Sequence, residues 1–425
     1  MRITTLAVTV AAIGLSACGT LNGKSAHEMV QHSIERSLTK DYSYNYHGEI
    51  KAYLSPPDKG EAPDTAAASA AASSAVQTDE NETPETPALL GGKAADWLQA
   101  NPALARYLEN GRLKYTGAVD LRRKQIEFIP ELTFNNHNEN SSIRMPMLFD
   151  GNDMSLTADM PASIPVILNF FVEPKLRERL INEPLRITLT DAAESFDTDG
   201  KIKQLPVKSA VKAAYIAILR AYGDIPAQYY TALPPDSYAK QAGAKYRIRY
   251  VEDAAFEKLY LQASTKHFRR ELDRLQKEAP EKGIGAEKYE ELKQWADSLA
   301  DTGELPSSSS LVGVPILTDW YLDRKGRIVG MRSFLQANGK EKALNISSVF
   351  YMHDFNRPKF TFQPKQGKTI SWKELADAVT AQKNARYGED GSEDGGEIGE
   401  PNRIYEKRCA DTRLNKRQRP KPLQK

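Results

Sequence analysis

Two serine–lysine pairs have the spacing that can activate a serine nucleophile: Ser37 with Lys40, and Ser209 with Lys212. Penicillin-binding enzymes use a Ser-x-x-Lys pair of this kind. Those enzymes also carry Ser-Asp-Asn and Lys-Thr-Gly motifs, and neither occurs in this chain. Both pairs lie in segments with helical periodicity, where residues three apart share a face for geometric reasons alone. We therefore expect no catalytic role for them.

Other catalytic and metal-binding patterns are absent or incomplete. The sequence has no Gly-x-Ser-x-Gly, His-Glu-x-x-His, Cys-x-x-Cys or Walker motif. His27 and His32 are five residues apart, so they do not share a helix face. Asp197-Thr198-Asp199-Gly200 resembles the start of a calcium loop, but Lys208 stands where the bidentate glutamate belongs. We expect no metal, no cofactor and no enzymatic activity; a cell-wall-acting enzyme is the alternative.

The N-terminus offers a different reactive group, the thiol of Cys18. An apolar run from Leu6 to Leu15 is too short to span a bilayer, which takes roughly 20 residues, and has the length of a signal-peptide core. It ends in Leu15-Ser16-Ala17-Cys18, which resembles the lipobox of bacterial lipoproteins. The resemblance implies that residues 1–17 are a signal peptide cleaved after Ala17 and that Cys18 carries the lipid, including palmitate. The alternative is an ordinary secretory signal followed by a chance cysteine.

The position after Cys18 indicates the target membrane. In the diderm bacteria that this motif resembles, an aspartate there tends to retain a lipoprotein at the inner membrane, whereas this chain has Gly19. The resemblance thus implies lipid anchoring in the cell outer membrane, facing the periplasm. Cys409 is the one other cysteine, so an acylated Cys18 leaves it no internal disulfide partner. It is then a free thiol or a link to another chain.

Composition describes the body behind the anchor. Removing 17 of 425 residues leaves 408, enough for one large or two ordinary domains. Apolar residues make up 40% of the chain and charged residues 27%, with a net charge of only +2. This balance predicts a globular body. An exported protein with so little net charge is not expected to bind nucleic acid.

Hydrophobic periodicity divides the chain into segments. Residues 18–54 read as a capped helix followed by a strand, in which apolar and aromatic residues alternate from Tyr42 to Leu54. Residues 55–92 are rich in Ala, Ser, Pro and acids, and we expect a disordered insertion in a loop; a linker between domains is the alternative. Residues 93–164 predict a short helix over 96–108 and then an antiparallel β-meander, with Pro130 at an edge or bulge.

The second half changes its period twice. Residues 165–306 predict a helical subdomain with three helices, the first presenting an apolar face from Val207 to Tyr222. Residues 307–385 predict β-hairpins, with turns at Asp323-Arg324-Lys325-Gly326 and Asn338-Gly339, a last short strand at Lys359–Phe362, and a helix. Residues 386–425 predict a disordered tail that is basic at its end.

The segment from Trp320 to Val329, and Asp354-Phe355-Asn356-Arg357-Pro358 after the next strand, carry a family resemblance. They are similar to the closing hairpins of the Lol lipoprotein carrier and of the mycobacterial LppX-type lipoproteins. The resemblance implies an α+β fold in which a curved antiparallel sheet, an incomplete barrel, is closed by packed helices. In this chain the fold also carries a large helical insertion. The family's cavity holds acyl chains or other lipids.

Two groups of residues are candidate contacts. An apolar cavity is expected to be lined from the first strand and the meander, although a packed core would show the same pattern. Its candidate residues are Tyr42, Tyr44, Tyr46, Phe128, Leu132 and Phe134. The tail is a candidate for contact with anionic lipid headgroups, through Arg413, Lys416, Arg417 and Arg419, against the alternative of a solvated end.

Two functions are compatible with these observations. The first is an outer-membrane lipoprotein without enzymatic activity that binds a lipid or another apolar ligand in a concave sheet. The second is a structural or assembly lipoprotein of the cell envelope that acts through protein partners. An open apolar cavity favours the first, and a closed core with a large exposed apolar patch favours the second.

Overall fold

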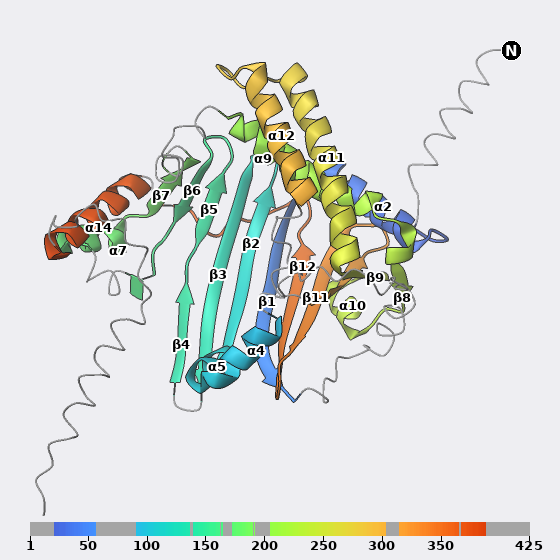
Figure 1. Ribbon diagram of the computed structural model, residues 1–425, viewed down its shortest axis with the longest axis horizontal. Coiled ribbons are helices and arrows are strands. Elements are labelled where there is room, and N and C mark those ends of the chain that lie inside the picture. The colour runs from blue at the N-terminus through green and yellow to red at the C-terminus, as the bar shows by residue number, and fades with distance from the viewer. Residues whose placement is uncertain are drawn as a thin grey trace, which may run out of the picture.

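The computed structural model in Figure 1 describes residues 21–56, 91–136, 139–161, 163–164, 172–189, 191, 205–302, 314–364 and 367–387. Ala17, Cys18, most of the 55–92 segment and the four basic residues of the tail (Arg413, Lys416, Arg417 and Arg419) lie outside these ranges. The predictions made for them therefore stay predictions.

One sheet of thirteen strands forms the body, in the order β13-β7-β6-β5-β3-β2-β1-β12-β11-β10-β9-β8, with β4 paired to β3 alone. The strands are β1 (Ser43–Ser55), β2 (Gly111–Asp120), β3 (Gln125–Asn136), β4 (Glu139–Arg144), β5 (Met147–Asp150), β6 (Ser155–Ala158), β7 (Leu185–Thr188), β8 (Thr231–Leu233), β9 (Tyr246–Glu252), β10 (Ile316–Leu322), β11 (Ile328–Asn338), β12 (Ala343–His353) and β13 (Ile370–Ser371). All neighbours are antiparallel except β13 and β7. The sheet is curved and does not close into a barrel, which confirms the predicted α+β class.

The described residues form nine α-helices. They are α2 (Ala26–Thr39), α4 (Gly91–Ala100), α5 (Pro102–Asn110), α7 (Pro174–Asn182), α9 (Val207–Asp224), α10 (Ser237–Ala242), α11 (Ala254–Glu278), α12 (Ala286–Thr302) and α14 (Trp372–Tyr387). The predicted helix over 96–108 is in fact two helices. Asn101 precedes Pro102, and a residue before proline is disfavoured in the helical conformation, so the chain breaks there.

The segment 165–306, for which the sequence predicted a helical subdomain, contains long helices in its described residues and also supplies three strands of the sheet. Its long helices are α9, α11 and α12, and its strands are β7 at one end of the sheet and β8 and β9 at the other. Of these three strands, only β9 corresponds to a stretch that the sequence itself marks as a possible strand, Tyr246 to Val251. The strands β7 and β8 have four and three residues, which is too short for a reliable alternation pattern.

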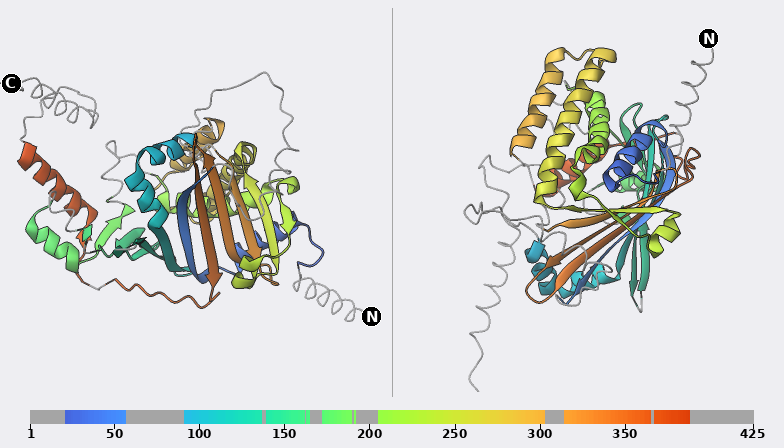
Figure 2. Two further views of the ribbon diagram at one scale, coloured as in Figure 1. Left: turned by 90° about the horizontal axis from the view of Figure 1, so that it is seen from below. Right: turned by 90° about the vertical axis from the view of Figure 1, so that its right-hand side faces the viewer.

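The two faces of the sheet are covered differently. On the inner face, which carries Tyr46, Tyr115 and Phe350, α2 and α11 bury an aromatic core against β9 and β10. The helix α4 packs on the same face near the other end of the strands, against β11 and β12. Figure 2 shows these helices, with α9 and α12, on one side of the sheet in its right-hand view. The short helix α10 packs on the outer face, against Tyr321 and Val329.

A strap, residues 354–364, crosses the outer face. The Asn45 side chain on β1 exchanges two hydrogen bonds with the Lys359 backbone: Nδ2 donates to the carbonyl and Oδ1 accepts from the amide, each at 2.8 Å. Two strands away on β3, the carboxyl group of Glu127 accepts from the backbone amides of Thr361 and Phe362. The strand predicted at Lys359–Phe362 is therefore wrong. This segment runs across the strands, so side chains rather than a neighbouring strand satisfy its backbone.

Pro130 lies inside the sheet and not at its edge. β3 has β2 on one side and both β4 and β5 on the other, and Pro130 faces the break between those two short strands. A proline cannot donate a ladder hydrogen bond, so the interruption on the side opposite β2 accommodates it.

The strap makes Glu127 a residue on which stability depends. Glu127 is 1% exposed, and Glu127→Ala leaves the backbone amides of Thr361 and Phe362 without their acceptor, the second of them buried. We expect a loss of about 3 kcal/mol in the free energy of unfolding, measured by urea titration. Glu131→Ala changes the same strand and the same face without a strap contact, and we expect a much smaller loss. Equal losses in the two variants would contradict this account of the strap.

Candidate functional site

A cavity of about 710 Å³ opens between α2, α9 and the β2–β3 and β5–β6 turns. Its wall combines the C-terminal turn of α2 with one side of α9 and α11, with the ends of β3 and β5, and with the turns beside these two strands. The lining residues are Ser37, Leu38, Thr39, Leu121, Lys124, Ile126, Phe149, Gly151, Asn152, Met154, Lys208, Val211, Lys212, Tyr215, Ile216, Arg220, Glu271 and Arg274.

The floor of the cavity is apolar because it is the inner face of the sheet. Ile126 of β3 and Phe149 of β5 are cross-strand partners on that face. Met154 follows in the next turn, where its φ of +55° turns the chain into β6. Across the cavity, Val211 and Tyr215 lie one helical turn apart on α9. Burial raises the pKa of the Tyr215 hydroxyl, so this group is neutral at physiological pH.

The orientation of α9 leaves this wall open. Ala213, Ala217 and Ala221 are at most 2% exposed and form the side of α9 that packs towards α11. The apolar face predicted from Val207 to Tyr222 is only partly buried, because Val211, Tyr215 and Ile218 are 39–50% exposed. Small side chains let two helices approach closely, so the alanine side rather than the larger apolar side makes the helix contact.

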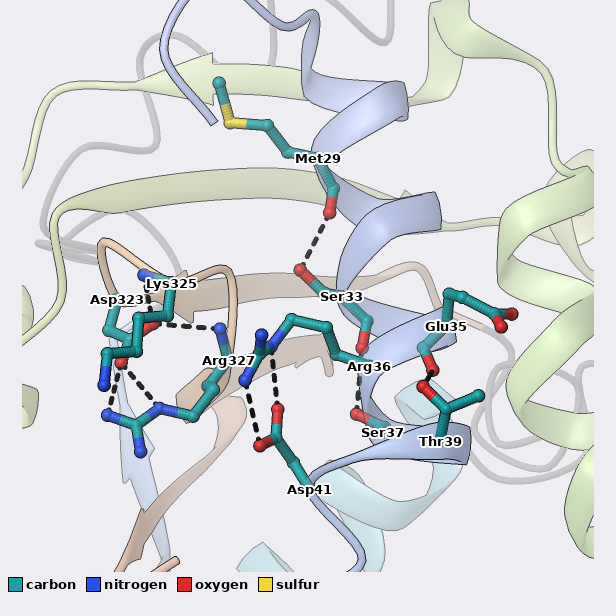
Figure 3. A network of polar contacts seen from close by, with 10 residues as sticks. All are labelled: Met29, Ser33, Glu35, Arg36, Ser37, Thr39, Asp41, Asp323, Lys325 and Arg327. Carbon is teal, nitrogen blue, oxygen red and sulfur yellow. Dashed lines mark hydrogen bonds and ion pairs between the residues drawn. The ribbon is translucent and has the colours of Figure 1, made fainter. Parts of the chain in front are cut away.

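The helix α2 is held firmly at both ends. Ser25 and Glu28 form the predicted capping box at its start. At its end, the Arg36 guanidinium forms a bidentate ion pair with the Asp41 carboxylate, in which Nε donates at 2.9 Å and Nη2 at 3.0 Å. This pair fixes the turn into β1 (Figure 3). The hydroxyls of Ser37 and Thr39 donate to carbonyls four residues earlier. Leu38, between them, is thereby held at the cavity wall.

The turn at residues 323–326, in the C-terminal half of the chain, packs against α2. In the predicted turn, Asp323 Oδ1 accepts from the backbone amides of Lys325 and Arg327 (Figure 3). Gly326 has φ of +77°, as expected, and a Cβ there would lie 2.6 Å from Cδ2 of His32. Only glycine gives both this conformation and this approach. Burial lowers the pKa of His32 against this turn.

The cavity wall is strongly basic. Five of its residues are basic and one is acidic, an excess of four positive charges: Lys124, Lys208, Lys212, Arg220 and Arg274, against Glu271. Arg274 pairs with Glu271 and Glu278, and Lys208 Nζ donates to the Asn152 carbonyl at 3.3 Å. Arg220 Nε is buried and has no hydrogen-bond partner among the described residues. The charge of this wall is therefore only partly neutralised by the protein.

The six residues predicted to line a cavity lie elsewhere on the sheet. Tyr44 contacts Tyr46, whose ring also contacts Tyr115 and Phe350. A Cβ on Gly117 would lie 2.6 Å from the Tyr46 ring, so this tyrosine lies flat across β2 and donates from its hydroxyl to the Glu127 carbonyl.

The other four predicted residues are distributed along the same strands. Tyr42 lies under the Arg122 guanidinium, 4.3 Å from ring centre to Cζ. Phe128 contacts Tyr115, Leu132 is 50% exposed, and Phe134 packs on Tyr107 of α5. Within the described residues, none of the six is among those that line the 710 Å³ cavity.

The remaining sequence motifs have ordinary structural roles. Ser37 bonds to its own helix, and the Ser209 hydroxyl lies 3.4 Å from that of Tyr289. His27 Nε2 lies 3.0 Å from the Gly223 carbonyl. Over the described ranges, no three His, Cys, Asp or Glu residues are grouped to hold a metal ion, and no helix has the length and hydropathy needed to cross a membrane. The Asp197–Gly200 motif lies outside those ranges.

Comparison with known proteins adds no family. No protein-family model matches the chain, and no curated protein matches it. The function is therefore argued from the geometry of the site and from the sequence.

Acidification should weaken the support of α2. The lowered pKa of His32 means that the unfolded chain binds a proton before the folded one does, so stability is complete above pH 6.5 and falls below it. We expect His32→Asn to show a smaller loss of melting temperature between pH 7.5 and pH 5.5 than the unchanged protein. His353→Asn, at an exposed histidine, is the control. An unaltered pH dependence in His32→Asn would contradict the assignment.

Proposed function

We propose that this chain is a lipoprotein of the bacterial outer membrane that binds the apolar part of a lipid in the 710 Å³ cavity of its inner face. The cavity itself carries the proposal. Its volume falls within the ~300–1,000 Å³ typical of small-molecule sites, and its floor is built from apolar side chains such as Ile126 and Phe149. No catalytic group takes part, so the proposed activity is binding alone.

The placement of the cavity supports a ligand rather than a filled core. The inner face is covered by α2 and α11 near β9 and β10 and by α4 near β11 and β12. The cavity lies beyond both groups, at β3 and β5, and Val211 of α9 remains 45% exposed beside it. Such a side chain gains the most from a ligand that removes it from water.

The proposed location rests on the sequence. The Leu15–Cys18 motif supports acylation of Cys18, and Gly19 supports the outer membrane over the inner membrane. Several acyl chains on one cysteine anchor a protein stably, whereas a single chain binds only marginally. The body is then held at the periplasmic surface, next to a source of lipids.

An assembly role through protein partners is the second candidate, and one observation favours it. Apolar side chains are exposed around α4, α5 and the β3–β4 edge: Trp97, Leu104, Tyr107, Leu132 and Ile143. Such a patch is typical of interaction surfaces. It lies apart from the cavity wall, so variants at the cavity separate the two candidates.

Filling the cavity should weaken lipid binding. We expect Val211→Trp to weaken binding of the fluorescent fatty acid cis-parinaric acid by about tenfold or more, because the indole occupies the space of the acyl chain. Ile181→Trp places the same side chain on α7 at another exposed apolar position, and its affinity should equal that of the unchanged protein. If Val211→Trp binds the probe as tightly as Ile181→Trp, the cavity is not the lipid site.

Acylation can be tested at the two cysteines. Cys18→Ser should lose incorporation of labelled palmitate and move from the membrane fraction to the soluble fraction. Cys409→Ser should keep both the label and the membrane fraction, since its thiol is not in a lipobox. A Cys18→Ser protein that stays with the membrane would overturn the proposed anchor.

A further inference from the structure

We infer that the ligand of the cavity is an anionic amphiphile, whose phosphate-type headgroup lies against Arg220 and Lys212 while its acyl chain occupies the apolar floor. The inference rests on the proposed function and adds the chemistry of the headgroup.

The charges of the wall carry the first step. Of its five basic side chains, Arg274 is neutralised by Glu271 and Glu278, and Lys208 donates to a backbone carbonyl. For Lys124, Lys212 and Arg220, the described residues supply no ion pair. Three cations beside an apolar floor match a ligand with a charged end and an apolar end.

Arg220 carries the second step. Its Nε is buried without a hydrogen-bond partner in the described part of the chain, which is unfavourable unless an acceptor is present. Arg220 also lines a second, polar cavity of about 270 Å³ between α2, α9 and α11, so its side chain lies where the two cavities adjoin. An anionic oxygen at this junction would satisfy the guanidinium from the side of the larger cavity.

The groups that line the second cavity favour placing the headgroup in the larger cavity instead. The groups that face Arg220 there are Glu35, Asp224, His267 and Arg270. Asp224 Oδ2 already lies 3.0 Å from His267 Nε2, and Arg270 contacts His267 Nδ1. This cavity is smaller, and its lining is polar and includes the carboxyl groups of Glu35 and Asp224. It therefore does not offer a second apolar site. The headgroup is therefore placed at Arg220 and Lys212, within the larger cavity.

A free phosphate ion satisfies the same cations, but it leaves the apolar floor exposed to water. An amphiphile buries the floor and pairs the charges together, so the two parts of the wall support one ligand. The occupant that we propose is thus a lipid with one anionic headgroup.

Matched ligands test the inference by isothermal titration calorimetry of the protein from residue 19 onward. The probes are monooleoyl lysophosphatidic acid, monooleoylglycerol, which has the same acyl chain without the phosphate, and inorganic phosphate. We expect the phosphate-bearing lipid to bind about tenfold or more tightly than monooleoylglycerol, and inorganic phosphate to bind weakest. A higher salt concentration should reduce the difference in affinity between the phosphate-bearing lipid and monooleoylglycerol.

Variants assign the preference to the named side chains. Arg220→Gln with Lys212→Gln should lose most of the preference for the phosphate-bearing lipid over monooleoylglycerol. Lys212→Gln alone changes an exposed side chain, so folding is not at risk, and it should lose part of the preference. Lys114→Gln, an exposed lysine on the outer face of β2, is the matched control and should lose nothing.

Each other outcome has a definite meaning. Equal affinity of the unchanged protein for the two lipids overturns the inference and leaves the proposed function standing. Inorganic phosphate binding as tightly as the phosphate-bearing lipid also overturns it. Failure of both lipids to bind rejects the proposed function itself.

Discussion

The pairing of β1 with β12 is the constraint on which the rest of the structure depends. Residues 45–55 pair in register with residues 353–343, and the other edge of β1 pairs with β2. Without β1, the sheet separates into one part ending at β2 and another beginning at β12. Nearly 300 residues lie between the paired strands. Bringing them together therefore costs loop-closure entropy, and this loss comes before the rest of the sheet can form. Because α2 directly precedes β1, the same pairing brings α2 over the inner face.

The cavity follows from how that inner face is covered. Its apolar surface is wider than any one helix, and the helices reach it as separate groups, with α2 and α11 against β9 and β10 and α4 against β11 and β12. The alanine side of α9 packs towards α11, so the larger side chains Val211 and Tyr215 remain beside the opening. Lys212 and Arg220 of the same helix then lie at the edge of the apolar floor. One wall thus offers both a charged surface and an apolar surface, as an amphiphilic ligand requires.

Much of this fold could be predicted from the sequence, because alternation and turn residues are local signals. The first strand, the meander, the hairpin with Gly326 and the three long helices were predicted in this way. Strand order, the strap and the open side of α9 could not, because they depend on contacts between distant residues. The cavity shows the same limit: alternation placed Tyr46 on the inner face correctly, but the glycine beside it on β2 lets the ring lie flat on the sheet. Lysines spaced among apolar residues at 207–216 were the available signal for the actual wall.

The strap links the centre of the sheet to its far edge through a short piece of chain. It is fixed to β1 by Asn45 and to β3 by Glu127, and the chain then continues to β13, which pairs with β7 at the far edge. The eight peptide units from Phe362 to Ile370 therefore limit how far β13 can lie from β3. Phe149 and Met154 of the cavity belong to β5 and to the turn before β6, which lie between β3 and that edge. A short connection on the outer face of the sheet therefore limits the spacing of the strands that form the floor of the cavity on the inner face.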